Sequence, residues 1–455
     1  MRYASAVGRL TLAPAPGGVR DAVRRRLDVR EIRTILWIVA IASLAITLAK
    51  AIKIGVAFHQ VDFAVYLLGA RHVFAGSLYT TFLAFPRKSF TYPPVAALVF
   101  IPFTALSRVP AQILWAVVST ALLVGLLFCS LRAARPGWRR SNVILWSFVL
   151  SYPAMILNPV AQTFALGQIN LLVALLVLAD LTGAYTLRGH SLPRGLMTGI
   201  AAALKLTPLV FVPFLFATRQ AKAARVALIT FLACDITMLV ATPTESWSYW
   251  TKYVLDTQRV GGVVYIANQS LRSMIVRFGH AHVSEPLIAL AVLLVGIAGL
   301  AVAVWAYRSS STLLGVLLCA TTGLIVSPIT WGHHLVWVVP VMVWLALAPD
   351  RPAFGRVWAG LAALWFWYGP IWRVPYGSGR ELHDTVAQLL VGDSYSIAMM
   401  FFVLGTAVML MLRRSRYRAE GNRETREPTA ERMPTQRSHP MRGSGSKASG
   451  STVPC

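Results

Sequence analysis

The sequence has little charge for its length, and acidic residues are the scarcer charged kind. Only 13% of its 455 residues are charged, and Asp and Glu together number 17. A soluble domain is typically about one quarter charged, so a soluble globular fold is excluded. Because acids are scarce, each carboxylate in a predicted loop is a candidate for a specific role.

The chain also lacks the features of two other classes of protein. It has four cysteines, of which Cys129, Cys234 and Cys319 fall in apolar runs and Cys455 ends the chain. This pattern predicts neither a disulfide framework nor a cysteine-bound metal. The series of ~10-residue alternating segments that builds an outer-membrane barrel is absent as well.

Long apolar runs are what the sequence has in abundance. Hydrophobic residues make up 56% of the chain, and the mean hydropathy is +0.61. Many of the runs are ~15 to 25 residues long, enough for a helix to cross ~30 Å of hydrocarbon. We therefore predict an all-α polytopic membrane protein with about twelve transmembrane segments. The predicted segments are 34–57, 92–107, 110–131, 142–157, 169–187, 194–217, 226–243, 286–307, 312–326, 334–348, 356–372 and 395–412.

The net charge of +26 is concentrated at the two ends of the chain. Residues 1–33 hold eight arginines, and residues 413–455 hold nine arginines and one lysine. Basic flanks beside membrane helices are typical of cytoplasmic segments that face anionic lipid, so we expect no nucleic-acid partner. The predicted organisation is a basic cytoplasmic segment (1–33), a transmembrane domain (34–412) and a disordered basic cytoplasmic tail (413–455).

Twelve crossings place both termini in the cytoplasm and four loops outside the membrane. The predicted outer loops are 58–91, 244–285, 327–333 and 373–394. Simple alternation also places residues 132–141 outside, although this loop carries four arginines and should be cytoplasmic.

A second topology removes that conflict. If segments 92–107 and 194–217 are both re-entrant or broken, residues 132–141 move inside and the later topology is unchanged. Tyr92-Pro93-Pro94 and Lys205-Leu206-Thr207-Pro208 are plausible break points, because proline removes a backbone donor. The sequence alone does not decide between the two topologies. In both of them, the loops that carry the candidate catalytic and binding residues lie outside the membrane.

Asp62 is the leading candidate for a catalytic group. It follows the first apolar run and lies among the aromatic residues Phe58, Phe63 and Tyr66, spaced as on an amphipathic helix that extends to Gly76. Such a helix would hold the carboxylate at the edge of the lipid, where a partly desolvated acid can act as a general base. The alternative is an ordinary solvated loop charge.

His333 and His334 form a second candidate, directly after Ser327-Pro328-Ile329-Thr330-Trp331-Gly332. Adjacent residues at a helix start point ~100° apart, so we expect only one imidazole to face a site, where it could donate to a phosphate leaving group. The alternative is a packing pair. A zinc pair needs i, i+4 spacing and further ligands, which are missing, so we expect no metal.

Three further polar groups are candidates for substrate binding. In the triplet Asn268-Gln269-Ser270, the amides offer both donors and acceptors to sugar hydroxyls, and Arg272 or Arg259 could clamp a phosphate. Lys205 lies inside an apolar run, where a lysine usually faces a cavity or snorkels to the interface. Gln168 and Asn170 start an apolar run, and helix capping is their alternative role.

These residues resemble a known family, glycosyltransferase family 87, the polyprenyl-phosphate-mannose-dependent α-(1→2)-mannosyltransferases of actinobacteria. The matching motifs run in order from Asp62 to His334 and leave out the two termini. They are Asp62-x3-Tyr66, Gly76-x-Leu78-Tyr79, Phe90-Thr91-Tyr92-Pro93-Pro94, Gly167-Gln168-Ile169-Asn170, Ala202-Ala203-Leu204-Lys205-Leu206-Thr207-Pro208, Asn268-Gln269-Ser270-Leu271 and Ser327-Pro328-x2-Trp331-x-His333-His334.

The resemblance implies the helical GT-C fold in a bacterial plasma membrane, with the active site on the extracytoplasmic face. It implies a polyprenyl-phosphate-linked sugar donor, a glycolipid acceptor, no cofactor, and Asp62 as the catalytic base. We expect His333 and His334 to take part in catalysis. The residues expected to bind substrate are Tyr66, Tyr92, Gln168, Asn170, Lys205, Asn268, Gln269, Arg272 and Trp331.

Three rival functions are compatible with a polytopic helical protein. Some relatives in the family transfer arabinofuranose in place of mannose. A transporter or lipid flippase would need inverted repeats and paired broken helices, and no repeat is visible. A membrane scaffold would leave the acid and the histidines unexplained.

Overall fold

A computed structural model describes residues 18–84, 86–184 and 192–424, with side chains described for residues 30–416 within those ranges. The chain forms two compact units, residues 1–407 and 408–455. Within the described ranges the fold is helical, and extended pairing is limited to two isolated bridges, Phe82–Ser89 and Asn268–Trp331. The predicted all-α class is therefore confirmed.

Five helices of the described chain are long and apolar enough to cross a membrane. They are α1 (Gly18–Ala57), α4 (Arg108–Ala134), α11 (Ala221–Ala241), α15 (Glu285–Ser309) and α20 (Ser394–Glu424). Four shorter apolar helical segments accompany them, at 170–182, 207–217, 312–326 and 332–347. The count of twelve spans and the GT-C type stay predictions.

The remaining elements are shorter. The α-helices are α2 (Val61–His72), α3 (Pro94–Leu98), α5 (Arg140–Val149), α6 (Ser151–Met155), α7 (Asn158–Leu166), α8 (Asn170–Thr182), α9 (Leu196–Leu204), α10 (Phe211–Ala217), α12 (Pro243–Ser248), α13 (Thr257–Val260), α14 (Leu271–Phe278), α16 (Thr312–Val326), α17 (Val338–Leu347), α18 (Gly355–Tyr368) and α19 (Val386–Gly392). Tighter or wider turns are η1 (Ile101–Ala105), η2 (Thr207–Val210), η3 (Tyr249–Tyr253), η4 (Gly332–Trp337), η5 (Pro370–Trp372) and η6 (Arg380–Leu382).

Segments 92–107 and 194–217 are both broken, as the second topology requires. The first is divided into α3 and η1, and the second is divided into α9, η2 and α10. Lys205 is extended (φ −156°, ψ 127°) and ends α9, and Pro208 follows in the next turn. Proline has no N–H to donate to the carbonyl four residues earlier and its ring clashes with that carbonyl, which for Pro208 belongs to Leu204, the last residue of α9.

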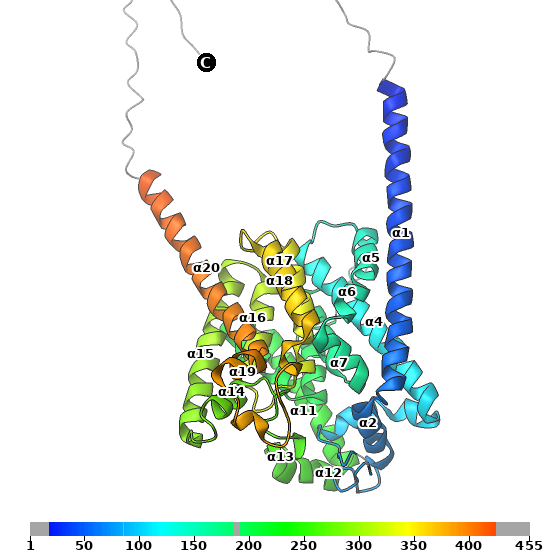
Figure 1. Cartoon of the computed structure of the whole chain (residues 1–455), viewed down its shortest axis with the longest axis vertical. Coiled ribbons are helices and arrows are strands. Elements are labelled where there is room, and N and C mark those ends of the chain that lie inside the picture. The colour runs from blue at the N-terminus through cyan, green and yellow to red at the C-terminus, as the bar shows by residue number, and fades with distance from the viewer. Residues whose placement is uncertain (1–17, 85, 185–191, 425–455) are drawn as a thin grey trace, which may run out of the picture. The chain divides into compact units, whose positions relative to one another are not determined.

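The arginine-rich loop 132–141 lies at the N-terminal end of the first span. The guanidinium of Arg33 donates to Ser141 Oγ at 3.4 Å. Asp62 follows the other end of α1, which is ~36 Å further along the helix axis at 1.5 Å per residue. Figure 1 shows the same arrangement, with α5 beside the upper part of α1 and α2 below its lower end. The loop 132–141 and Asp62 thus lie at opposite ends of α1, which is the arrangement that the second topology predicts.

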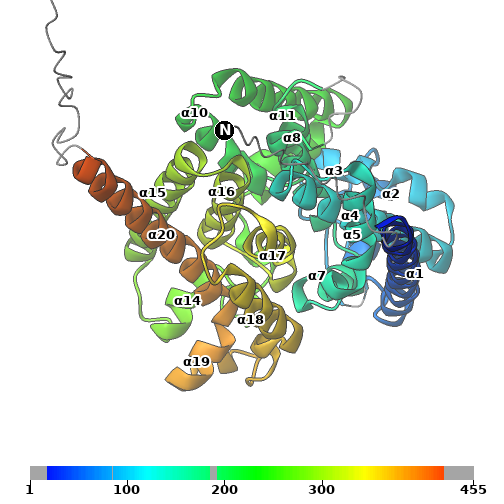
Figure 2. The same cartoon turned by 90° about the horizontal axis from the view of Figure 1, so that it is seen from above.

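The centre of the first unit is built on α8 and α16. Both are apolar all round, and a helix of that kind is stable only when other helices surround it. Nine of the 13 residues of α8 and 13 of the 15 residues of α16 are buried, and the others are only partly exposed. In the view of Figure 2 these two helices are enclosed by α4, α11, α15 and α17.

A fully buried ion pair ties the outer loops to one another. The Arg277 guanidinium on α14 binds the Asp393 carboxylate, and neither side chain is exposed. Arg277 also donates to the carbonyl oxygens of Val264, Tyr265 and Asn268. Removing one partner of such a pair leaves a buried uncompensated charge, at a cost of about 3–5 kcal/mol. This pair therefore holds the segment 263–268 in place.

In the second unit, the described chain is the end of α20, which continues to Glu424. The predicted span ended at residue 412, but a helix that already exists is extended without a new nucleation step. The rest of the predicted tail, 425–455, lies outside the described residues, as do residues 1–17 of the N-terminal segment.

Candidate active site

A cavity of about 810 Å³ lies where α2, the chain 82–92, the segment 258–267 and the segment 331–333 meet. Its volume is within the range of pockets that bind small molecules. Asp62 and His333, which are 271 positions apart in the sequence, both line it. The two leading candidates of the sequence therefore share one site.

The start of α2 presents Asp62 to this cavity. His59 and Gln60 have left-handed backbone angles (φ 62° and 41°), which turn the chain sharply between α1 and α2. The side-chain amide of Gln112 donates to the His59 carbonyl at 2.7 Å and holds this turn. Asp62 is then in the first turn of the helix, where the helix dipole favours a carboxylate.

Both oxygens of the Asp62 carboxylate are hydrogen-bonded. Lys88 Nζ lies 2.8 Å from Oδ1, and Gln168 Nε2 donates to Oδ2 at 2.5 Å. The Asp62 side chain is 13% exposed, whereas Lys88 is 45% exposed. A carboxylate oxygen has more than one lone-pair site, so each can still accept the proton of a substrate hydroxyl.

Two tyrosines fix the amide of Gln168 in the orientation that Asp62 needs. Tyr66 Oη donates to Gln168 Oε1 at 2.7 Å, and Tyr92 Oη does so at 3.3 Å. Burial raises the pKa of the Tyr66 phenol well above its ordinary value, so it stays a protonated donor at neutral pH. With Oε1 engaged by phenols, the NH₂ group of Gln168 is directed at the carboxylate.

Of the two histidines, His333 is the one that lines the cavity. Its Nε2 atom is buried and has no hydrogen-bond partner within the described protein. Its carbonyl oxygen is held from behind by Thr163 Oγ1 at 3.1 Å and Asn170 Nδ2 at 3.0 Å. The ring is therefore placed with one nitrogen available to a ligand.

His334 points elsewhere, with its ring plane at 85° to that of His333. Its Nδ1 accepts from the Trp331 backbone N–H at 3.2 Å, and its Nε2 lies 3.0 Å from Lys205 Nζ. Both ring nitrogens are thus used inside the protein, and His334 does not line the cavity. The expectation that only one imidazole faces the site agrees with this geometry.

Lys205 and Asn170 lie behind the cavity wall. Lys205 Nζ donates to Asn170 Oδ1 at 2.8 Å and lies 5.5 Å from the centroid of the Tyr92 ring. Neither residue lines the cavity. Lys205 and Asn170 were expected to bind substrate. The structure places them instead behind the cavity, where they contact His333 and Tyr92.

The structure also does not bring Asn268, Gln269 and Arg272 to the cavity. Asn268 and Gln269 are fully buried. Asn268 Oδ1 accepts from the Thr330 backbone at 2.9 Å, and Gln269 Nε2 donates to the Ile266 and Gly392 carbonyls at 2.7 and 2.8 Å. Arg272 forms a bidentate pair with Glu285 at 2.6 and 2.7 Å. The two amides join the outer loops because irregular buried chain must satisfy its polar atoms.

Some residues that line the cavity were not predicted from the sequence. Lys88 is the ion-pair partner of Asp62, and the available signal was its place two residues before Phe90-Thr91-Tyr92. Tyr265 and Trp372 line the cavity together with Trp331.

Arg259, which the sequence suggested as a possible phosphate clamp, does line the cavity. Its guanidinium donates to the Tyr79 carbonyl and lies 4.3 Å from the centroid of the Tyr253 ring.

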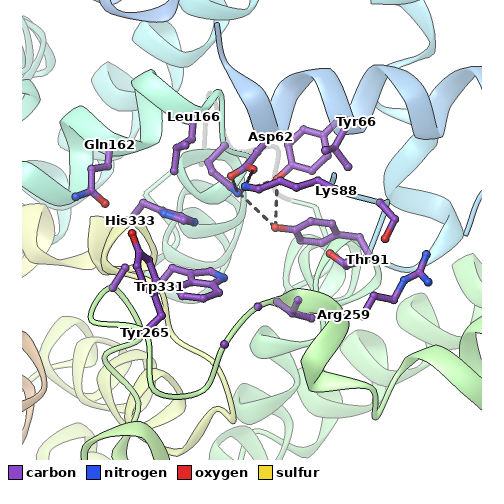
Figure 3. Close-up of a pocket in the computed structure, with 18 of the residues that line it drawn as sticks. Asp62, Tyr66, Lys88, Thr91, Gln162, Leu166, Arg259, Tyr265, Trp331 and His333 are labelled. Atoms are coloured by element: carbon purple, nitrogen blue, oxygen red, sulfur yellow. Dashed lines mark hydrogen bonds and ion pairs between the residues drawn. The ribbon is translucent and has the colours of Figure 1, made fainter. Parts of the chain in front are cut away.

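Figure 3 shows how these groups are distributed. Lys88, Thr91 and Arg259 lie on one side of the cavity, and Trp331, Tyr265 and His333 lie on the other. Asp62 and Tyr66 lie between the two sides. In the part of the chain that the structure describes, no three His, Cys, Asp or Glu residues gather to hold a metal ion. The absence of a cofactor stays a prediction.

The sequence resembles known proteins over much of its length. The family model described as "Glycosyltransferase family 87" matches residues 90–328. No solved structure matches the chain significantly.

Two relatives from Mycobacterium tuberculosis illustrate the likeness. The chain is 32% identical, over 71% of its length and 78% of the relative, to "Polyprenol-phosphate-mannose-dependent alpha-(1-2)-phosphatidylinositol mannoside mannosyltransferase". It is 37% identical, over 64% of its length and 67% of the relative, to the corresponding pentamannoside mannosyltransferase. A third relative, of the first kind and from Mycolicibacterium smegmatis, is 31% identical over 74% of the chain and 81% of the relative.

Proposed function

Because this chain belongs to glycosyltransferase family 87, we propose that it transfers mannose from a polyprenyl-phosphate carrier to a lipid-anchored mannoside, forming an α-(1→2) linkage. The relatives' names support this donor and an acceptor of the phosphatidylinositol-mannoside type. The observation that carries the proposal is the cavity that Asp62 and His333 share.

Asp62 acts as the general base. The acceptor hydroxyl oxygen attacks the anomeric carbon of the β-linked mannosyl phosphate, and its proton passes to a carboxylate oxygen of Asp62. The bond from the anomeric carbon to the phosphate oxygen breaks as the new one forms, so polyprenyl phosphate leaves from the opposite face. One displacement of this kind inverts β to α and needs one carboxylate, whereas a retaining glycosidase uses a pair.

The phosphate group is stabilised by donors on the walls of the cavity. Lys88 and Arg259 supply positive charge, and Arg87 also lines the cavity. His333 Nε2, which has no partner in the described protein, supplies a hydrogen bond to a phosphate oxygen. Donors held in place in a partly desolvated site stabilise developing charge without reorganisation, so charge on the leaving group is met by the protein's own side chains.

The enzyme works at the extracytoplasmic face of the bacterial plasma membrane, with both termini in the cytoplasm. The arginine-rich loop 132–141 lies beside Arg33, at the end of α1 far from Asp62. Basic loops favour the cytoplasmic side, so this arrangement supports an outward-facing cavity. A polyprenyl carrier embedded in the bilayer then delivers its sugar beside α2.

The proposal is tested with purified protein in lipid nanodiscs, labelled polyprenyl-phosphate mannose and a phosphatidylinositol mannoside acceptor. We expect a mannosylated lipid whose new residue is released by an α-(1→2)-specific mannosidase. A parallel reaction with polyprenyl-phosphate arabinofuranose should give no product. Transfer from the arabinose donor alone, or resistance of the product to the mannosidase, would contradict the assignment.

A further inference from the structure

One side of the cavity is an aromatic wall made by Tyr265, Trp331 and Trp372. The ring centroids of Tyr265 and Trp331 are 6.1 Å apart, and those of Tyr265 and Trp372 are 6.5 Å apart. The three residues come from separate outer segments, and all three line the cavity and are partly exposed. They do not simply fill the hydrophobic core.

The wall is held rigidly by contacts behind it. The Gly332 backbone donates to the Ala267 carbonyl at 2.8 Å, beside the bridge between Asn268 and Trp331. Gly261 has φ 144°, and a Cβ atom there would be 2.6 Å from Trp331 Cζ2. Gly261 thus packs directly on the indole of Trp331.

Trp372 is fixed in a different way. Its indole N–H donates to Asn158 Oδ1 at 3.1 Å, and the Tyr395 hydroxyl binds the same oxygen at 3.1 Å. The polar edge of Trp372 is therefore satisfied inside the protein. A ligand in the cavity would therefore contact the apolar ring surface of Trp372.

The charges of the cavity lie away from this wall. The lining residues with full charges are Asp62, Arg87, Lys88 and Arg259, and Figure 3 shows Lys88 and Arg259 across the cavity from Tyr265 and Trp331. The cationic side suits a phosphate. The aromatic wall suits an uncharged ligand with one apolar face, because an aromatic ring combines a large apolar surface with a negative face that attracts weakly positive C–H groups.

We propose that the aromatic wall of Tyr265, Trp331 and Trp372 is the acceptor subsite, and that it stacks against the C–H face of the terminal mannosyl residue of the acceptor lipid. This inference rests on the proposed mannosyl transfer and adds the position of the acceptor. A pyranose ring presents its C–H groups on one face and directs its hydroxyls outward from its rim. Stacking on the wall holds one hydroxyl toward Asp62 while the donor phosphate occupies the cationic side.

The test compares Trp372→Leu with Trp372→Phe. Both lose the indole hydrogen bond to Asn158, but only Phe keeps an aromatic face. In the nanodisc assay, Trp372→Leu should raise the KM for the phosphatidylinositol mannoside about tenfold, and Trp372→Phe should recover most of that loss. The KM for labelled polyprenyl-phosphate mannose should change much less than the acceptor KM in both variants.

Tyr376→Leu is the matched control. Its ring lies 5.3 Å from that of Trp372, but the residue is exposed and does not line the cavity. We expect its acceptor KM to match the wild type. Should Trp372→Leu fail to fold, Tyr265→Leu against Tyr265→Phe carries the same comparison.

An unchanged acceptor KM in the Leu variants, or Phe variants as impaired as Leu, would overturn the acceptor subsite while wild-type transfer still supports the proposed function. A rise in the donor KM that equals the rise in the acceptor KM would overturn it too. Wild-type protein that transfers no mannose to the acceptor would overturn both proposals.

Discussion

At the residue scale, the site depends on side chains that hold other side chains. Asp62 is positioned by Gln168, and Gln168 is positioned by Tyr66 and Tyr92. His333 is positioned through its own carbonyl by Thr163 and Asn170. A reacting group held this way loses little freedom in the transition state, which is where orientation contributes to rate.

The two histidines should respond differently to removal. His333→Ala should reduce transfer with little loss of stability, because the lost nitrogen faces the cavity and has no partner in the described protein. His334→Ala should lower the free energy of unfolding by about 1–3 kcal/mol, because it leaves the buried Trp331 N–H without a partner and removes one of the two groups that contact Lys205 Nζ. Thermal melting and initial transfer rates in nanodiscs measure the two effects. If both variants lost the same stability and the same activity, this division of roles would be contradicted.

The sequence predicted the chemical residues of the site better than its supporting ones. Asp62, Tyr66, Tyr92, Gln168, Trp331 and His333 all line the cavity, as expected for substrate-facing groups. Asn268 and Gln269 have the donors and acceptors that sugars need, but buried backbone needs the same atoms, and sequence alone does not separate these uses. Lys88 was missed because its place beside Phe90-Thr91-Tyr92 was its one signal, and that signal does not show that the fold brings it to Asp62.

At the element scale, the packing of α2 against the end of α7 sets the position of the base. Gly167 ends α7 with φ 71° and is packed against residues of the α2 start. A Cβ atom at Gly167 would lie 2.5 Å from Phe63 Cβ and 2.9 Å from Gln60 Cβ. These contacts involve atoms close to the backbone, so they are relieved only if α2 moves.

Gly167→Ala should therefore both destabilise the protein and slow transfer. The left-handed backbone alone costs about 1 kcal/mol for alanine, and the contacts with Phe63 and Gln60 add to it. Gly183→Ala is the matched control, because Gly183 ends α8 with φ 66° and a Cβ atom there would meet no atom of the described chain beyond its own neighbours within 4 Å. Thermal melting and transfer rates compare the two, and an equal small effect in both would show that close packing at Gly167 is unimportant.

The elements themselves were largely foreseeable, and the breaks among them had a physical signal. Pro208 marked the break after α9, but Pro93 and Pro94 begin α3, and segment 92–107 is interrupted instead at 99–100, just before Pro102 in η1. The predicted span 142–157 is divided as well, into α5 and α6. The turn at His59 and Gln60 had no such signal, because neither residue is glycine and their left-handed backbone is imposed by the surrounding structure. The helical end of α20 past residue 412 likewise had no apolar pattern to announce it.

At the scale of the whole molecule, the arginine-rich loop 132–141 and the candidate site are at opposite ends of α1. The loop lies beside Arg33, whereas α2 and Asp62 follow the C-terminal end of that helix. The length of α1 between them is ~36 Å, enough to cross the hydrocarbon. The arginine-rich loop and the candidate site are thus separated by about the thickness of the hydrocarbon along α1.

Site-directed cysteine labelling checks this sidedness. In a background with Cys234→Ala and Cys455→Ser, a membrane-impermeant maleimide applied to intact cells should label Leu255→Cys, which is 87% exposed near the cavity end. Arg139→Cys, exposed in the arginine-rich loop, should be labelled only after the membrane is opened. Labelling of both positions in intact cells would contradict the topology.

The central claim is that Asp62 removes the acceptor proton, and the most direct measurement is transfer by Asp62→Asn, which keeps shape but loses the base. We expect its rate with labelled polyprenyl-phosphate mannose to fall about 100- to 10,000-fold, with melting temperature and donor retention unchanged. Glu285→Gln, which removes an exposed outer carboxylate paired with Arg272 away from the cavity, should transfer at the wild-type rate. An Asp62→Asn variant that transfers mannose as fast as Glu285→Gln would contradict the account.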